Sequence, residues 1–408
     1  MAEPNNTPYP PSTPVPASSP RSASPAPPIP NPSPDATAST APHPSGPEST
    51  TPARPIVLHI GDPIKYNHQT YAEFSTLFDV VRPSAQERER GELMRALKER
   101  RWGDFSAIFR PFWNTGGEMG RWDAELIDLL PDSVRIFASA GAGFDWADTQ
   151  LLGERGIIYC NSGLAAAESV ADFAVAMVIS TFRHLPWCMS AAVSPDPALF
   201  QSCHARATGA SHTLRGRVLG IVGLGNIGRH VAAKLGHSAF GMRVAYHDVV
   251  RRPAALEADL GAFFHSTLAS LLAASDCVVL CAPASPDGRP LVTAETLRHV
   301  KPGARFVNVA RGSLVDEDAL ADALEGGLVS AAALDVHADE PRVNPRLVRL
   351  AGELEGEAPG RVMLTCHNAG GTVETHVGFE ELSMRNIMAV LGGGEAVTPV
   401  NLEFLRRG

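Results

Sequence analysis

The stretch that decides the fold of this chain reads Gly223-Leu224-Gly225-Asn226-Ile227-Gly228. Residues 217–222 before it predict a short buried strand, and residues 227–235 predict an amphipathic helix. Residues 242–247 predict a second strand, which delivers Asp248 to its end. A strand, a glycine turn, a helix and a second strand with an acid about 20 residues past the last glycine are typical of a dinucleotide-binding β-α-β unit.

Each part of this unit has a physical role. The first glycine permits a tight turn, the second lets the backbone approach a pyrophosphate at the positive helix N-terminus, and the third allows close helix–strand packing. Asp248 would accept hydrogen bonds from a ribose 2′-hydroxyl and repel a 2′-phosphate, which favours NAD over NADP. Arg251 and Arg252 follow closely and could hold a phosphate, so NADP stays an alternative. A glycine turn in an unrelated α/β domain is the other interpretation.

The composition indicates a globular protein with a polar tail. Its 408 residues allow two domains of ordinary size, and 44% hydrophobic residues support buried cores. A formal net charge of −9 gives no reason to expect nucleic acid or an anionic membrane as a partner. We expect no apolar run as long as a membrane span and no secretory signal, because the first residues lack a basic start and an apolar core.

The six cysteines show no C-x-x-C motif and no spacing typical of zinc ligands. We therefore expect reduced thiols, no metal site and a cytoplasmic location. These cysteines are Cys160, Cys188, Cys203, Cys277, Cys281 and Cys366.

The chain divides into a tail and two domains. Residues 1–54 are almost entirely Pro, Ser, Thr, Ala and Asn, so they are predicted to be disordered, either as a passive tail or as a proline-rich docking segment. A substrate-binding domain is predicted from residues 55–165 and 372–408, and a dinucleotide-binding domain from residues 166–371. The first domain is discontinuous because a long amphipathic helix over 372–391 is expected to return to it.

Strands and helices alternate along both domains. Beyond the β-α-β unit, the expected strands are residues 56–60, 106–109, 135–139, 277–281, 305–309, 330–336 and 362–366. This alternation predicts an α/β fold with two Rossmann-like domains, each a doubly wound parallel sheet. A helix over 168–184 is expected to bridge the domains, and residues 190–213, rich in Ser, Ala and Pro, are predicted to be a loop.

Three chemically complementary residues follow the predicted strands, where ligands bind in open α/β sheets. An imidazole titrates near neutral pH, so His367 can give a proton to a nascent alkoxide and take it back in reverse. Glu340 would hold the other ring nitrogen, and Arg311 would bind a carboxylate and polarise the carbonyl beside it. Each residue alone could be structural, but together they predict carbonyl reduction by a nicotinamide cofactor.

A second glycine-rich turn, in the first domain, predicts an anion site. The turn follows the strand at 135–139 and reads Ala140-Gly141-Ala142-Gly143-Phe144-Asp145. Successive backbone N–H groups there can face a substrate carboxylate, although an ordinary glycine turn is the alternative. Phe112, Trp113 and Trp146 lie in neighbouring loops and either shape an apolar pocket or pack as core.

Five motifs in this order resemble the D-isomer-specific 2-hydroxyacid dehydrogenase family. They are A-G-A-G-F-D at 140–145, G-L-G-N-I-G at 223–228, N-V-A-R-G at 308–312, L-D-V-H-A-D-E-P at 334–341 and T-C-H-N-A-G-G at 365–371. The resemblance covers roughly residues 56–401, everything except the tail.

The resemblance implies a role for each matching residue. Arg311, Glu340 and His367 are implied as catalytic, and the backbone at Ala142 and Gly143 joins Arg311 and His367 in binding substrate. The resemblance also implies a homodimer through the nucleotide domains and Asp335 as the partner of the nicotinamide carboxamide. The predicted cofactor-binding residues are Gly223, Gly225, Asn226, Ile227, Gly228, Asp248, Pro283, Val309, Ala310, Asp335, His367 and Gly370.

Within the family, the chain looks most like the fungal D-mandelate dehydrogenase group, through A-G-A-G-F-D-W, L-D-V-H and E-T-H-V-G-F-E at 374–380. This implies bulky or aromatic substrates such as phenylglyoxylate and D-mandelate, with glyoxylate or hydroxypyruvate as the alternative. Formate dehydrogenases have Gln where this chain has Glu340, which argues against formate. An NAD(H)-sensing scaffold similar to the corepressors of this fold is the alternative from another class. Residues 353–360 are longer and more acidic than in many relatives and have no assigned role.

Overall fold

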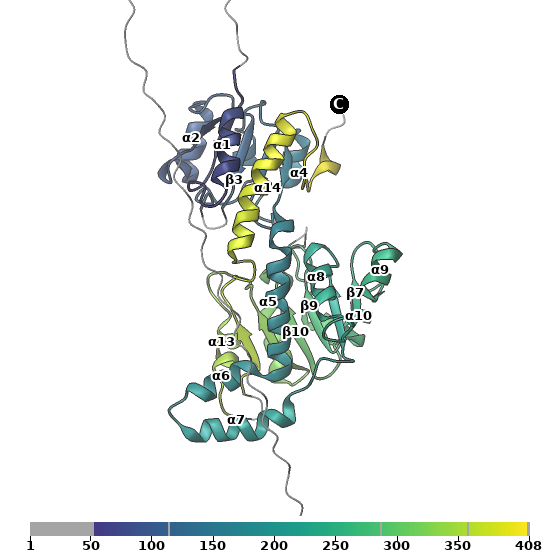
Figure 1. Ribbon diagram of the computed structural model, residues 1–408. Coiled ribbons are helices and arrows are strands. Elements are labelled where there is room, and N and C mark those ends of the chain that lie inside the picture. Colours follow the sequence, from purple (N-terminus) through teal and green to yellow (C-terminus); the bar gives the residue numbers. More distant parts are fainter. Residues whose placement is uncertain (1–52, 113–114, 286–287, 357–358, 406–408) are drawn as a thin grey trace, which may run out of the picture. The chain divides into compact units, whose positions relative to one another are not determined.

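The computed structural model describes residues 53–112, 115–285, 288–356 and 359–405. Within these ranges the chain forms two parallel sheets whose strands are joined by helices (Figure 1). This confirms the predicted α/β class with two doubly wound sheets. The predicted tail, residues 1–54, lies outside the described residues except for its last two positions.

The first sheet has five strands in the order β2-β1-β3-β4-β5, and every neighbouring pair is parallel. Its strands are β1 (Ile56–His59), β2 (Asp79–Val81), β3 (Ala107–Arg110), β4 (Ile136–Ser139) and β5 (Ile158–Cys160). Its helices are α1 (His68–Leu77), α2 (Arg90–Lys98), α3 (Ala124–Ile127), α4 (Thr149–Glu154) and α14 (Val373–Leu391). The inner strands β3 and β4 are buried along their whole length, which is why the first three residues of each are apolar without alternation.

The second sheet has seven parallel strands in the order β12-β11-β10-β9-β6-β7-β8. Its strands are β6 (Val218–Val222), β7 (Arg243–His247), β8 (Ala262–Phe264), β9 (Cys277–Leu280), β10 (Ala304–Asn308), β11 (Val329–Leu334) and β12 (Val362–Leu364). Its helices are α8 (Asn226–Leu235), α9 (Ala254–Leu260), α10 (Leu268–Ala274), α11 (Ala294–Leu297), α12 (Glu317–Glu325) and α13 (Pro345–Gly352). The predicted β-α-β unit is β6, α8 and β7.

Helix α14 returns the end of the chain to the first sheet. It packs against β3 and β4 and lies along α5 (Gly163–Arg183), as Figure 1 shows. Beyond α14, the buried Asn401 accepts a hydrogen bond from the backbone N–H of Tyr159 and donates to the carbonyls of Thr149 and Ile157. The first sheet is therefore completed by residues from both ends of the described chain. The exact domain boundaries at 165/166 and 371/372 stay a prediction.

Helix α5 corrects one expectation. Its 21 residues are long and apolar enough to cross a membrane by length and composition, whereas no such run was expected. It packs, however, against α8, α14 and strands β10 and β11, and 56% of its most apolar window is buried inside the protein. That burial is typical of a core helix.

The predicted loop over residues 190–213 is wrong, because most of that segment is helical. Helix α6 spans Leu185–Val193 and α7 spans Pro197–Ala210. The prolines lie in the first helical turns, where the missing N–H costs nothing, and Asp196 caps α7 by accepting from the N–H of Ala198. Composition suggested a loop, but a small core shared by the two helices stabilises the hairpin. That core contains Trp187, Ala191, Cys203 and Ala207, and Leu354 of the unassigned acidic segment packs against it.

Candidate active site

The glycine turn between β6 and α8 fits a pyrophosphate. Gly223 has a φ of +93°, and a Cβ atom there would lie 2.8 Å from the amide nitrogen of Ala282. A Cβ atom at Gly228 would lie 2.2 Å from the carbonyl oxygen of Gly223, so only glycine lets α8 approach the turn this closely. A Cβ atom at Gly225 would meet no described atom within 4 Å. The turn is therefore open on the side where the first residues of α8 present their N–H groups.

The other residues of the predicted cofactor set differ in their surroundings. Asn226 and Ile227 form the first turn of α8, Asn226 exposed and Ile227 half-buried. Ala282-Pro283 lies against the glycine turn, since Gly223 contacts Ala282. Val309 and Ala310 are buried in the cores on the two faces of the seven-stranded sheet, and Gly370 packs against α5. Direct contact of these residues with a cofactor stays a prediction.

Asp248 lies at the end of β7 and already has two partners. Its Oδ2 accepts a hydrogen bond of 2.8 Å from the N–H of Leu224, which ties it to the glycine turn. The same oxygen accepts 2.6 Å from a guanidinium nitrogen of Arg252. Arg251 turns away and forms a two-point ion pair with Glu257. Of the two arginines that could hold the 2′-phosphate of NADP, Arg252 therefore lies at Asp248, whereas Arg251 is bound to Glu257.

His367 and Glu340 form the predicted pair. The imidazole Nδ1 lies 2.7 Å from the Glu340 Oε2, and the other carboxylate oxygen accepts a hydrogen bond from the N–H of His337. A carboxylate at Nδ1 favours the tautomer that carries its hydrogen there. His367 has a φ of +54°, a left-handed conformation that few non-glycine residues adopt.

Asp335 holds the loop that carries this histidine. Its side chain is buried at the end of β11 and accepts hydrogen bonds from the Thr365 hydroxyl and from the backbone N–H groups of Asn368 and Ala369. The N–H of His367 donates to the Asp335 carbonyl at 2.7 Å. The unusual backbone conformation is therefore fixed from both sides by one residue. This anchoring was not foreseen, and the carboxamide contact of Asp335 stays a prediction.

Arg311 reaches across to the glycine-rich turn after β4. Its Nε donates to Asp145 Oδ1 at 2.9 Å, and its Nη1 donates to the carbonyl of Ala310 at 2.7 Å. A Cβ atom at Gly143 would lie 1.2 Å from Nη2, so the guanidinium rests directly on that glycine. Behind Arg311, Gly312 packs on the backbone of His337 and brings the β10 loop against the Glu340 loop.

The turn at residues 140–145 has the features predicted for a carboxylate site. Gly141 has a φ of +91°. The carbonyls of Gly141 and Ala142 accept hydrogen bonds from Ser162 and Asn161, which fixes the turn. The N–H groups of Gly141, Ala142 and Gly143 have no acceptor within the described part of the chain. These donors lie beside the Arg311 guanidinium, so the two predicted carboxylate-binding elements meet.

The structure thus brings predicted residues of the substrate site into two contacting groups. Gly143 touches Arg311, Arg311 pairs with Asp145, and Glu340 holds His367. In the sequence, Asp145 was only the last residue of the predicted anion turn, and the available signal was an acidic side chain two residues past Gly143.

The aromatic residues expected to shape a pocket are only partly described. Trp146 packs against Phe137 and Tyr159, and the guanidinium carbon of Arg110 lies 4.6 Å from the centroid of its ring. These contacts agree with the alternative that Trp146 packs as core. Phe112 lies near Gly61, and Trp113 lies outside the described residues. Among the residues that the structure places, no group of three or more His, Cys, Asp or Glu side chains could hold a metal ion.

A dinucleotide turn, an imidazole–carboxylate pair and an arginine beyond the ends of parallel strands define the class of Rossmann-fold oxidoreductases. Residues 175–369 match the family described as D-isomer specific 2-hydroxyacid dehydrogenase, NAD binding domain. The chain is 31% identical over 347 residues to 4-methyl-2-oxopentanoate reductase A of Aspergillus oryzae, a match covering 85% of this chain and 98% of that protein. This chain belongs to the D-isomer specific 2-hydroxyacid dehydrogenase family.

Two solved structures are similar over nearly their whole length. The holo form of Rhodotorula graminis D-mandelate dehydrogenase has a TM-score of 0.79 and 37% identity, covering 85% of this chain and 98% of that one. The NADPH-dependent glyoxylate/hydroxypyruvate reductase of Sinorhizobium meliloti, in complex with NADP and malonate, has a TM-score of 0.63 and 29% identity, covering 87% and 100%. The expected resemblance is therefore confirmed, and the protein is an oxidoreductase of this family.

Proposed function

We propose that this enzyme interconverts 2-oxo acids and D-2-hydroxy acids with NAD(H), and that its substrates are bulky or aromatic, such as phenylglyoxylate and D-mandelate. One observation carries the proposed chemistry. The guanidinium of Arg311 rests on Gly143, and the imidazole Nδ1 of His367 lies 2.7 Å from the carboxylate of Glu340. When bound at the glycine turn, the cofactor supplies or accepts the hydride. The chain's own residues must therefore bind the acid and move one proton.

His367 is proposed as the proton donor for reduction. Because Nδ1 faces Glu340, Nε2 is the nitrogen that can exchange a proton with the substrate oxygen. Glu340 stabilises the imidazolium by its charge and keeps the ring in one orientation. In the oxidation of a hydroxy acid the same nitrogen accepts the proton.

Arg311 and the turn at 140–143 are proposed to bind the substrate carboxylate. The guanidinium Nη2 and the N–H groups of Ala142 and Gly143 are among the donors of this region that have no acceptor in the described part of the chain. A carboxylate bound there would place its 2-oxo group beside a fixed positive charge, which favours the developing alkoxide.

We propose NAD in preference to NADP. The carboxylate of Asp248 is anchored by the Leu224 N–H at the position where a ribose 2′-hydroxyl is expected, and it opposes a 2′-phosphate. NADP stays the alternative, because the relative from Sinorhizobium meliloti is NADPH-dependent and was solved in complex with NADP. Steady-state rates with NADH and NADPH at equal concentrations test the preference, and equal kcat/KM for the two would refute it.

The preference for bulky substrates is supported by the relatives named after D-mandelate and 4-methyl-2-oxopentanoate. Glyoxylate or hydroxypyruvate is the second candidate, since a similar structure is a reductase of those acids. A panel of phenylglyoxylate, 4-methyl-2-oxopentanoate, hydroxypyruvate and glyoxylate decides between them by kcat/KM. The highest value for glyoxylate would replace the bulky-substrate proposal.

A scaffold that only senses NAD(H) is the competing function. It predicts NADH binding without turnover of any 2-oxo acid in the panel. The intact imidazole–carboxylate pair does not discriminate, because corepressors of this fold keep it, but the relatives named as a reductase and a dehydrogenase favour an enzyme.

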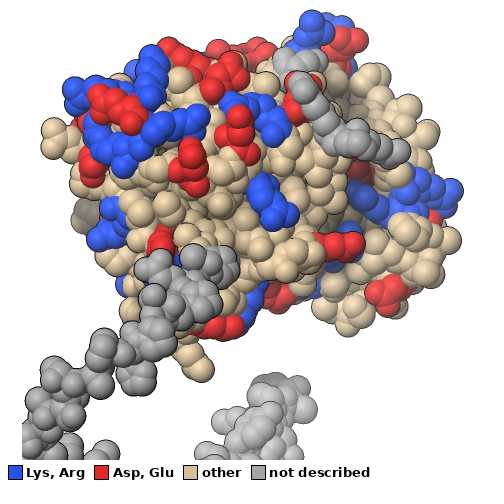
Figure 2. Space-filling model, turned by 90° about the horizontal axis from the view of Figure 1, so that it is seen from above, with Lys and Arg blue, Asp and Glu red and all other residues tan. Residues whose placement is uncertain are grey.

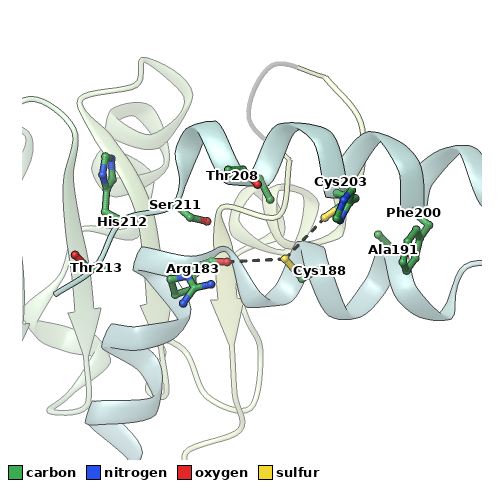
Figure 3. A pocket seen from close by; sticks show the side chains of 11 residues that line it. Arg183, Cys188, Ala191, Phe200, Cys203, Thr208, Ser211, His212 and Thr213 are labelled. Atoms are coloured by element: carbon green, nitrogen blue, oxygen red, sulfur yellow. Dashed lines mark hydrogen bonds between the residues drawn. The ribbon is translucent and has the colours of Figure 1, made fainter. Parts of the chain in front are cut away.

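We also propose a cytoplasmic homodimer assembled through the α6–α7 hairpin of the nucleotide-binding half. This hairpin exposes large apolar side chains and flanks the cavity of about 520 Å³ shown in Figure 3. By contrast, Figure 2 shows acidic and basic side chains interspersed over the face drawn there. The exposed apolar residues of the hairpin are Leu185, Met189, Val193 and Phe200. Light scattering of Met189→Asp/Val193→Asp tests the dimer, and an unchanged mass would refute this interface.

A further inference from the structure

Asp145 is the carboxylate that binds the guanidinium of Arg311 in the described part of the chain. The two residues are 166 positions apart in the chain, and their contact joins the turn after β4 to the loop after β10. Arg311 is mostly buried, with 19% of its side chain exposed, whereas Asp145 is 47% exposed. The arginine is thus a fixed element of the cleft, and the aspartate approaches it from the opposite sheet.

The contact leaves a defined part of the guanidinium available. Nε donates to Asp145 and Nη1 donates to the carbonyl of Ala310, while Nη2 has no acceptor among the described residues. Nη2 is also the atom that rests on Gly143, at the turn whose N–H groups meet no acceptor among the residues that the structure places. Because Asp145 holds Nε, the planar guanidinium group of Arg311 has little freedom to rotate at the end of its long side chain.

The charges around Asp145 support an ionised carboxylate. Partial burial alone would raise the pKa of Asp145, but the charge and hydrogen bond of Arg311, with a smaller effect of His367, hold the pKa below its usual range. Asp145 therefore remains negative at neutral pH. The side chains whose charges act on Asp145 are Arg311 and His367. The carboxylate of Glu340 lies 2.7 Å from His367 Nδ1.

We infer that Asp145 is a positioning residue for substrate recognition: it clamps the Nε edge of Arg311 so that Nη2 points at the carboxylate-binding turn. This inference rests on the proposed function and assigns a task to a residue outside the Arg311, Glu340 and His367 set. Asp145 itself does not touch the reacting atoms. Its effect is on how well the substrate carboxylate is held, so it acts mainly on KM.

The test compares Asp145→Ala with Asp145→Asn in the full-length protein. Alanine removes the clamp, whereas asparagine keeps an oxygen that can accept from Nε. Hydrogen bonds to charged groups correspond to roughly 10- to 100-fold in an equilibrium. We expect Asp145→Ala to raise the KM for phenylglyoxylate about tenfold or more with a smaller change in kcat, and Asp145→Asn to restore most of the loss. The matched control is Asp148→Asn, three residues away, where the carboxylate only caps α4.

A second measurement keeps the inference separate from the proposed function. Binding of oxamate, a non-reducible 2-oxo acid analogue, to the enzyme–NADH complex is measured by fluorescence titration and does not need turnover. Weaker oxamate binding by Asp145→Ala, with NADH affinity unchanged, supports the clamp even if the substrate panel fails. If Asp145→Ala has a KM no higher than wild type and binds oxamate at least as tightly, the inference is wrong, because Asp145 would then compete with the substrate for Arg311. An equal loss of NADH affinity overturns it as well.

Discussion

Replacement of Gly143 by alanine tests the contact between the two halves of the proposed site. The added Cβ atom would lie 1.2 Å from Arg311 Nη2 and 2.2 Å from Cζ, while ordinary van der Waals contact begins near 3.4 Å. The guanidinium must therefore retreat by about 2 Å. Gly143 does not have a positive φ, so the backbone accepts alanine, and the obstacle is the end of a flexible side chain. The variant should fold.

The expected loss is large because the displaced group is one that positions the substrate. A misplacement of about 1 Å near a reacting centre costs on the order of 100-fold in rate. Gly143→Ala is thus expected to lower kcat/KM for a 2-oxo acid by about 100-fold or more, while NADH still binds. The assay is steady-state NADH oxidation together with a thermal melt.

Gly91→Ala is the matched control for this variant. Gly91 lies in α2, and a Cβ atom there meets no described atom within 4 Å. The same chemical change should leave activity intact and stabilise the helix slightly. A Gly143→Ala enzyme with kcat/KM within about threefold of wild type, and an unchanged melt, would refute the placement of the guanidinium on this turn.

Four further predictions follow from the site and its supports. His367→Ala should abolish turnover while NADH still binds, and wild-type rates would remove the imidazole from the mechanism. Asp248→Ala should relax the preference for NADH over NADPH, whereas an unchanged ratio of kcat/KM values would count against a ribose contact. Asp335→Ala leaves a hydroxyl and two backbone N–H groups without their acceptor, so urea unfolding should show a loss of about 3 kcal/mol or more; a loss below 1 kcal/mol would contradict the anchoring role. Burial, with the nearby charge of Arg82, lowers the pKa of His59 to about 3, so the unfolded chain takes up a proton near pH 6.5 that the folded protein excludes. Stability should then fall by about 2 kcal/mol between pH 7 and pH 5, a loss that His59→Phe should remove; an equal loss in that variant would exclude His59 as its source.

Much of the fold was predictable because its signals are local. A parallel strand such as β9 is buried along its whole length, so it stands out as a short apolar run between helices. The three-residue edge strands β2, β5 and β8 were missed, whereas β12, an equally short edge strand, was predicted within residues 362–366. A run of three residues has too little periodicity to be detected consistently. The α6–α7 hairpin was misread for a different reason. Its Ser, Ala and Pro content is ambiguous, and the packing of Trp187 and Cys203 that decides the matter involves partners distant in sequence.

The site divides in the same way. The sequence by itself determined the glycine turn, the acid at Asp248 and the choice of Arg311, Glu340 and His367, because each follows a strand and strand ends in a parallel sheet meet at one edge. Only the tertiary structure decided that Asp145 binds Arg311, that Asp335 anchors the histidine loop and that Gly143 must lack a side chain. Those contacts depend on how two sheets built from separate stretches of chain face each other, and no local pattern of residues encodes that approach.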